Sequence, residues 1–107
     1  MNDLRARLRA VAAAGQTVRY GDLAREYDVR VSTLTEALEA LMAEDVAAGR
    51  PLLAVVCEGR LSGGMPARGF FEAAALLGRD VSDPVGLVTL EQAALVEAAG
   101  ALPRTPR

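Results

Sequence analysis

Any covalent chemistry in this 107-residue chain would have to centre on Cys57, its only cysteine. A thiol becomes a nucleophile as the thiolate, which a neighbouring histidine or cation stabilises. The next residue is Glu58, whose carboxylate would raise the thiol pKa instead, and the chain contains no histidine and no lysine. Cysteine is also among the residues most often found buried. We therefore predict that Cys57 is a structural residue and that the protein is not an enzyme.

The same composition argues against a metal or a cofactor. A structural zinc site takes four Cys or His ligands, which one cysteine without histidine cannot supply. Gly63 and Gly64 lie in a glycine-rich loop, but no Lys-Ser/Thr follows them, so the phosphate-binding loop motif is incomplete. No pair of carboxylates has a spacing that identifies a general acid and base. We expect no metal and no cofactor.

Capping signals and apolar spacing predict the elements that position these residues. Thr33 to Glu36 and Thr89 to Gln92 are capping boxes, which open helices. The six apolar residues from Leu52 to Cys57 are too short for a free helix and predict a strand buried on both faces. Four glycines between residues 59 and 69 predict a loop or an irregular hairpin. In chain order we expect helix 4–14, extended segment 16–19, helix 20–27, helix 34–48, strand 52–57, loop 59–69, helix 70–77 and helix 90–99.

This order is that of a winged helix, in which a helix-turn-helix is followed by a β-wing. The expected fold class is therefore α+β, mainly α and winged-helix-like, with a short β-wing and extra C-terminal helices packed against it. The length allows one domain, over residues 1–102. The last residues, 103–107, have the sequence PRTPR and are expected to form a flexible tail.

The segment TVRYGDLARE resembles the start of the helix-turn-helix in alkylguanine-DNA alkyltransferases and alkyltransferase-like proteins, which carry a Val-x-Tyr-Gly-x-Leu-Ala pattern there. PLLAVVCEGRLSGG is similar to their Pro-Cys-His-Arg-Val segment, so the resemblance spans Thr17 to Gly64. It implies a winged-helix domain that binds DNA, with Cys57 as the alkyl acceptor and Tyr20 near a DNA phosphate. MPARGFFEAA also resembles a segment of small bacterial proteins, and that likeness implies no function.

Three departures separate this chain from the alkyltransferase pattern. Glu58 stands where the family has the histidine that activates the thiol, and Val56 stands where it has proline. The third helix, from Thr33 to Gly49, lacks the arginine that the family inserts into the duplex in place of the flipped base. The resemblance therefore implies the fold and argues against the alkyl-transfer reaction.

Double-stranded DNA is the first ligand to consider for a helix-turn-helix. The third helix is acidic, with Glu36 and Glu39 near its start, and the chain has a net charge of −2. Contacts are therefore expected at the helix N-terminus, which attracts phosphate, and at the arginines that flank the glycine-rich loop. The residues expected to contact DNA are Tyr20, Arg30, Thr33, Thr35, Arg60 and Arg68.

The alternative is a protein-interaction or dimerisation module. The acidic third helix would then face a basic partner, and the Phe70-Phe71 pair would supply an aromatic anchor. More often such a pair belongs to the core, with one ring pointing inward. The C-terminal helix, from Leu90 to Ala99, is rich in alanine and offers a second route to a homodimer.

Nothing in the sequence predicts a membrane partner. The N-terminus MNDLRARLRAV has no apolar segment of the signal-peptide type. No stretch approaches the ~20 apolar residues that span a bilayer. We expect a cytoplasmic protein.

Overall fold

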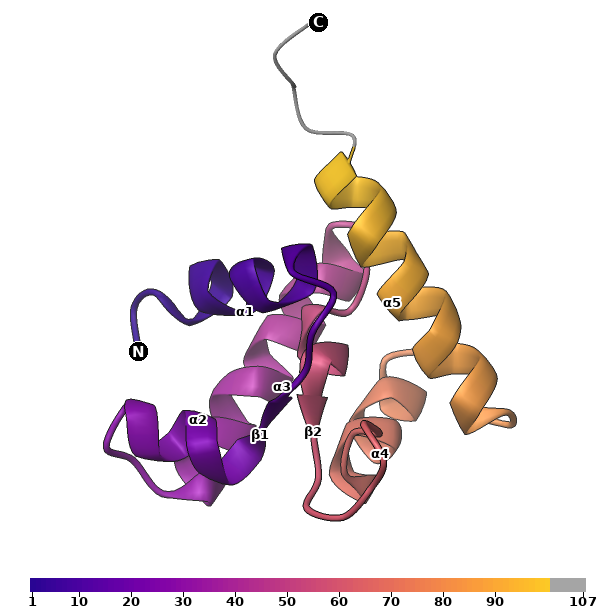
Figure 1. Cartoon of the computed structure of the whole chain (residues 1–107). Coiled ribbons are helices and arrows are strands. Elements are labelled where there is room, and N and C mark those ends of the chain that lie inside the picture. The colour runs from indigo at the N-terminus through magenta and orange to yellow at the C-terminus, as the bar shows by residue number, and fades with distance from the viewer. Residues whose placement is uncertain (101–107) are drawn as a thin grey trace, which may run out of the picture.

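The protein, in a computed structural model that describes residues 1–100, is mainly helical with a two-stranded sheet (Figure 1). The α+β, mainly α class is thereby confirmed. The end of the predicted domain and the predicted tail, residues 101–107, lie outside the described residues. The elements are α1 (Leu4–Ala13), β1 (Val18–Arg19), α2 (Tyr20–Glu26), α3 (Val31–Ala47), the 3-10 helix η1 (Leu53–Val56), β2 (Cys57–Glu58), α4 (Arg68–Leu76) and α5 (Pro84–Gly100).

The apolar segment from Leu52 to Cys57 runs through the centre of the molecule. All six of its side chains are buried, and α1, α3 and α5 pack against η1. The prediction that this segment is buried is confirmed, but the prediction of a strand is wrong for Leu53 to Val56, which form a 3-10 turn. A strand needs a neighbouring strand for its N–H and C=O groups, and here helices lie on the surrounding sides. Only Cys57 and Glu58 are extended, and they pair in parallel with Val18 and Arg19.

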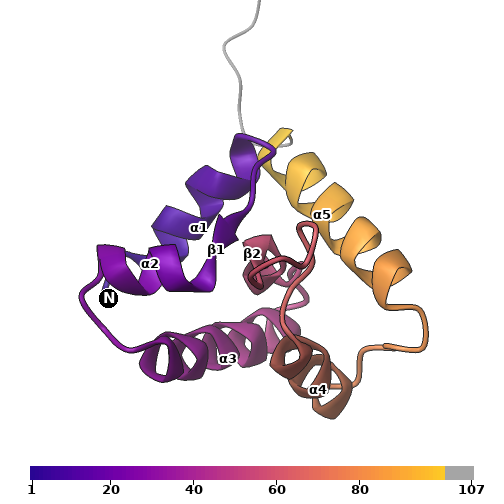
Figure 2. The same cartoon turned by 60° about the horizontal axis from the view of Figure 1, so that its bottom comes forward.

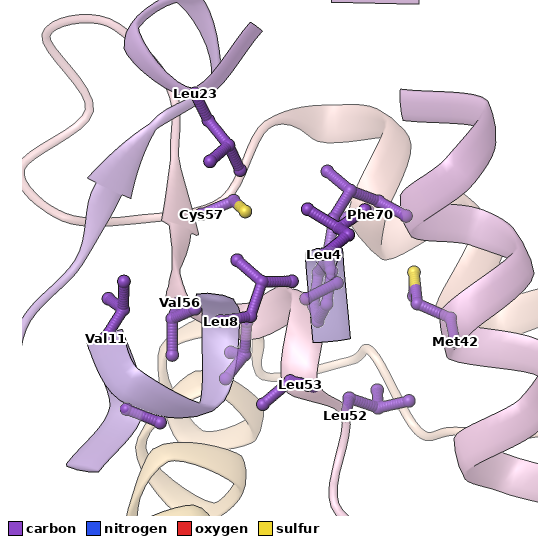
Figure 3. Close-up of a cluster of buried hydrophobic side chains, with 14 of the residues drawn as sticks. Leu4, Leu8, Val11, Leu23, Met42, Leu52, Leu53, Val56, Cys57 and Phe70 are labelled. Atoms are coloured by element: carbon purple, nitrogen blue, oxygen red, sulfur yellow. The ribbon is translucent and has the colours of Figure 1, made fainter. Parts of the chain in front are cut away.

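The core around this segment comes from one stripe on each helix, as Figure 3 shows for α1, α3 and their neighbours. Leu4, Leu8 and Val11 form the buried stripe of α1. In α3 the buried stripe holds Leu34, Leu38 and Met42 and then, one turn later, Asp45. Spacings of three and four residues place such side chains on one helix face, so the apolar residues were predictable and the buried carboxylate was not.

Three helices begin earlier than the sequence predicts, two of them ahead of their capping boxes. α3 starts at Val31, so Thr33 lies inside its first turn and does not cap it. α5 starts at Pro84 instead of Leu90. Asp83 caps it, because Asp83 Oδ1 accepts a hydrogen bond from Gly86 N (3.0 Å). Proline suits the first helical position because an N–H group there would have no partner within the helix. Thr89, inside the helix, donates to Val85 O instead. α4 also starts two residues early, at Arg68.

Two carboxylates bind the backbone where the central segment begins. Asp45 Oδ2 accepts a hydrogen bond from Leu53 N (3.1 Å), and Glu91 Oε1 accepts one from Leu52 N (2.7 Å). Asp45 is fully buried, and its other oxygen lies 2.6 Å from Arg5 Nη1 and 3.1 Å from Arg50 Nε. Helices α3 and α5 are thus joined to η1 by directed polar bonds as well as by apolar contact.

Between residues 1 and 100, no helix is both long enough and apolar enough to cross a membrane.

Replacing Asp45 with alanine is expected to lower the free energy of unfolding by about 2–4 kcal/mol. The change leaves the buried Leu53 N–H without an acceptor and removes the anion between Arg5 and Arg50. Urea unfolding followed by circular dichroism measures the difference.

Glu44→Ala is the matched control for this change. Glu44 also pairs with Arg5 (2.8 Å), but its side chain is 60% exposed. Exposed ion pairs contribute about 0–1 kcal/mol. If both variants lost the same small amount of stability, the bond from Leu53 N to Asp45 would not have the structural importance described here.

Candidate nucleic-acid interface

Tyr20 opens α2 and holds the start of α4 beside it. Its hydroxyl oxygen accepts a hydrogen bond from Ala67 N (3.0 Å), where Ala67 is the residue directly before α4. Burial raises the pKa of Tyr20 to about 12, so the phenol stays neutral at physiological pH. A neutral phenol that accepts one hydrogen bond keeps its own proton to donate. Tyr20 therefore has a structural role and retains one donor for an external acceptor.

A hollow of about 190 Å³ lies where α2, α3 and α4 meet. It brings together Tyr20 and Thr35, two of the residues predicted to contact DNA, and Glu39 also lines it. The Thr35 hydroxyl donates to Ser32 O (2.9 Å), which leaves its oxygen free to accept. Thr35 and the start of α4, through Ala67 and Gly69, therefore border a common hollow. Its remaining lining residues are Leu38, Met42, Ala54 and Phe70.

The N-terminus of α3 carries Arg30 and Thr33, which are both exposed. Arg30 occupies the capping position and makes no capping hydrogen bond through its side chain. The first helical bond is donated by Leu34 N to Arg30 O, so the N–H groups of the three preceding residues have no partner within the helix. Unpaired N–H groups and the positive end of the helix dipole both attract anions.

Arg60 lies in the segment between Gly59 and Ala67, which we call the wing loop. The structure assigns no strand to this part of the chain, so it forms a closed loop instead of a β-hairpin. The Ser62 hydroxyl lies 2.6 Å from both Gly59 O and Met65 O, and Gly59 N donates to Met65 O (2.9 Å). Gly63 and Gly64 adopt φ values of 65° and 89°, where a side chain would be strained. These bonds hold the loop that carries Arg60 in one shape.

Arg68 is the first residue of α4, and its side chain is 93% exposed. Its Nε lies 3.7 Å from Glu72 Oε1 one turn along the helix. This is a long contact between two exposed groups, and such pairs contribute little. The guanidinium of Arg68 can therefore leave Glu72 and bind another anion, such as a phosphate, with little loss of stability.

The wing loop, α2, α4 and the start of α3 lie at the same end of the molecule. They occupy the lower part of Figure 1, below α1 and the C-terminal half of α5, and Figure 2 brings that end forward. The structure places Tyr20, Arg30, Thr33, Thr35, Arg60 and Arg68 in these elements. Only Tyr20 and Thr35 among them line the hollow.

Most arginines between residues 1 and 100 are within 4 Å of a carboxylate. Arg9, Arg30 and Arg60 form none of the ion pairs found in this part of the chain. Two of these three, Arg30 and Arg60, belong to the predicted DNA contacts. The exposed Glu36 and Glu39 of α3 also form no ion pair with another described residue, so they bring negative charge to the same end.

Cys57 has the surroundings of a core residue. It is completely buried, and burial raises the pKa of its thiol to about 12. Glu58 does not activate it, because the Glu58 carboxylate accepts a hydrogen bond from the Thr17 hydroxyl and lies 3.9 Å from Arg19 Nε. No group of three or more His, Cys, Asp or Glu side chains able to hold a metal occurs within residues 1–100.

The chain matches no family model, no curated protein and no solved structure. Its likeness to the alkyltransferases therefore rests on the short segments around Tyr20 and Cys57 alone.

We expect Cys57 to react at least about a hundredfold more slowly with a thiol reagent in the folded protein than in urea at pH 8. The thiolate is the reactive form, and a pKa near 12 in place of 9.0 makes it scarce. Absorbance at a fixed concentration of Ellman's reagent gives both rates. Because the folded pKa is the higher one, the thiol stabilises the fold below pH 9.0, and this stability is lost as the pH rises toward 12. Equal rates in the two states would show that Cys57 is accessible and that its pKa is not raised, which would contradict this prediction.

Proposed function

We propose that the protein is a non-catalytic, winged-helix-like module that binds double-stranded DNA. In this proposal α2 and α3 form the helix-turn-helix, and the wing loop takes the place of a β-wing. The observation that carries it is the exposed start of α3, where Arg30 forms no ion pair within residues 1–100 and no side chain caps the helix. A helix start of this kind favours a phosphate oxygen.

The proposed contacts fall into two groups. At the start of α3, Arg30 and the Thr33 hydroxyl bind phosphates, and Thr35 faces the hollow. In the wing loop and at the start of α4, Arg60 and Arg68 bind the phosphate backbone. Tyr20 keeps the two groups in register through its bond with Ala67, and its phenol proton is available to a phosphate oxygen.

The acidic residues of α3 restrict how DNA can approach. Glu36 and Glu39 are exposed one to two turns after the helix start. Phosphates lying along the helix would be repelled by these carboxylates. The module therefore contacts DNA with the N-terminus of α3 and with the wing loop. Helix α3 does not lie lengthwise along the phosphate backbone of the DNA.

No step of this function uses Cys57. The alkyltransferase reaction would need a thiolate open to a flipped base, whereas Cys57 is buried and its pKa is raised to about 12. From the resemblance to the alkyltransferases the proposal takes the arrangement of the helices and the position of Tyr20. It does not take the alkyl-transfer reaction.

The double variant Arg60→Ala/Arg68→Ala is expected to weaken DNA binding and to lower the salt dependence. Each phosphate contact adds about 0.9 to the slope of log K against log salt on B-DNA, so two lost contacts lower the slope by about two. Fluorescence anisotropy with a labelled duplex over a salt series measures this slope.

Arg7→Ala/Arg9→Ala is the control with the same change in charge. Both arginines belong to α1, on the far side of the molecule from the wing loop in Figure 1. This variant should keep the slope of the unaltered protein. No binding by the unaltered protein at low salt would refute the DNA proposal, and an equal loss in both variants would show a non-specific charge effect.

A protein-interaction module is the second candidate, and the free acidic side chains of α3 favour it. Phe70 is not available as an aromatic anchor, because it is buried and its ring packs edge-to-face against Phe71 at 5.2 Å. The interaction would rest on Glu36 and Glu39, which would attract a basic partner.

Glu36→Gln/Glu39→Gln separates the two candidates. If DNA is the ligand, the affinity for duplex should rise severalfold, because two charges that repel phosphate are gone. If a basic protein is the ligand, the same variant should lose its partner in a pull-down and gain nothing on DNA. Glu97→Gln on α5 removes a charge away from this end and serves as the control.

A further inference from the structure

A hollow of about 390 Å³ lies between α1 and α5, away from the candidate nucleic-acid interface. Figure 2 shows the C-terminal ends of these two helices side by side. The side chains that line the hollow come from both helices, from the end of α3 and from the segment that leads into η1. Sites for small molecules have volumes of about 300–1,000 Å³. The hollow is therefore large enough for a small molecule.

The walls of this hollow are apolar and are formed mostly by small side chains. Ala12 and Ala13 line it from α1, and Leu95, Ala98 and Ala99 line it from α5. Residues three or four apart share one helix face, so α5 presents a continuous apolar stripe to the hollow. The alanine side chains leave open a space that larger residues would fill. The remaining apolar lining residues are Pro51 and Leu53.

The charged residues of the lining leave an excess of positive charge. They are Arg5, Arg9, Arg50 and Asp45. Asp45 Oδ1 lies 2.6 Å from Arg5 Nη1 and 3.1 Å from Arg50 Nε, so its negative charge is already compensated. Glu44 lies outside the lining and pairs with Arg5 (2.8 Å). Even when Glu44 is counted, three guanidinium groups face two carboxylates, and one positive charge remains.

Arg9 and Arg50 carry the donors that an external anion could use. A guanidinium has five N–H donors. Arg9 forms no ion pair within residues 1–100, and Arg50 pairs with Asp45 through Nε alone. The two Nη groups of Arg50 therefore remain for another partner. Guanidinium groups bind carboxylates through short, charge-assisted hydrogen bonds.

We propose that this hollow binds a small carboxylate with an apolar body, such as a medium-chain fatty acid. The carboxylate lies against Arg9 and Arg50, and the apolar chain lies along the alanines of α1 and α5. The single excess positive charge matches one carboxylate. A cation would be repelled by it, and a neutral apolar molecule would gain nothing from the two guanidinium groups.

Other occupants match only part of this lining. Nucleic acid is anionic, but its interfaces with proteins are more polar than these alanine walls. A small inorganic anion would leave the apolar walls exposed to water. Residues 101–107 follow α5 in the chain and contain two arginines and no acidic side chain, so their charge opposes that of Arg9 and Arg50.

The hollow and the proposed DNA contacts belong to different parts of the molecule. None of the residues expected to contact DNA lines this hollow. A carboxylate bound between α1 and α5 leaves the start of α3 and the wing loop open. The two proposals can therefore fail separately.

Titration of the ¹⁵N-labelled full chain with octanoate, followed by NMR, tests the proposal. Octan-1-ol has the same chain without the charge, and acetate has the charge without the chain. Octanoate should bind at least about tenfold more tightly than either, because only octanoate uses both the guanidinium groups and the apolar walls. The amide signals of Ala12, Ala13 and Leu53 should shift.

Two variants separate the charge from the apolar walls. Arg9→Gln should weaken octanoate binding at least about fivefold and leave octan-1-ol unaffected, because it removes a charge-assisted bond. Ala98→Trp should weaken both ligands, because the indole fills the hollow. Both positions are exposed, so the variants should fold, which circular dichroism verifies. The matched controls are Arg25→Gln and Ala6→Trp, which alter exposed residues outside the lining.

The pattern of affinities decides the proposal. Octanoate that binds most tightly, shifts the signals of the lining residues and is weakened by Arg9→Gln but not by Arg25→Gln supports it. No binding of octanoate, equal binding of octan-1-ol or acetate, or equal effects of the variants and their controls overturns it.

Shifts confined to the wing loop or to the start of α3 would also overturn it, because the carboxylate would then occupy the proposed DNA contacts instead of the hollow.

Discussion

Two carboxylates on different helices hold the segment around which the protein is built. Asp45 of α3 and Glu91 of α5 accept the N–H groups of Leu53 and Leu52, at the start of a 3-10 turn that is surrounded by helices. A buried N–H without a partner costs about 1–3 kcal/mol, so these bonds decide where the turn can begin. Arg5 compensates the charge of Asp45 and joins α1 to the same point. Apolar packing alone would allow the helices to slide, whereas these directed bonds fix their register.

The position of the candidate interface follows from this anchor. Once η1 is fixed, Cys57 comes next and pairs with Val18, which places Tyr20 two residues later at the start of α2. Tyr20 in turn binds Ala67 and sets the start of α4. Cys57 therefore contributes to the surface through its place in the pairing, although its thiol takes no part in chemistry. The core residue Cys57 and the sequence motif around Tyr20 are thus linked through the pairing of β2 with β1.

The sequence predicted the helices and the apolar stripes well, because these depend on local spacing. It did not predict the roles of Asp45 and Glu91, although a signal existed: both continue a buried stripe, Asp45 after Leu38 and Met42. A charged residue is normally exposed, and only the tertiary arrangement of Arg5 and the 3-10 turn makes burial favourable. The prediction of a strand for Leu53 to Val56 was wrong for a similar reason. A strand forms only where a neighbouring strand can pair with it, and a local sequence pattern does not reveal such a neighbour.

The candidate interface was harder to predict than the fold, because the chain contains many arginines and the sequence does not say which are free. Seven of the ten arginines between residues 1 and 100 lie near carboxylates, and some of these, such as Arg5, support the core. Within the same residues, Arg30 and Arg60 form no ion pair, and both lie at the end where α3 begins. Two unpaired arginines, with the unpaired carboxylates of Glu36 and Glu39 nearby on α3, are enough to bind only a small number of phosphates. Any preference for a DNA sequence would then have to come from Thr33 and Thr35, the uncharged polar side chains between those contacts.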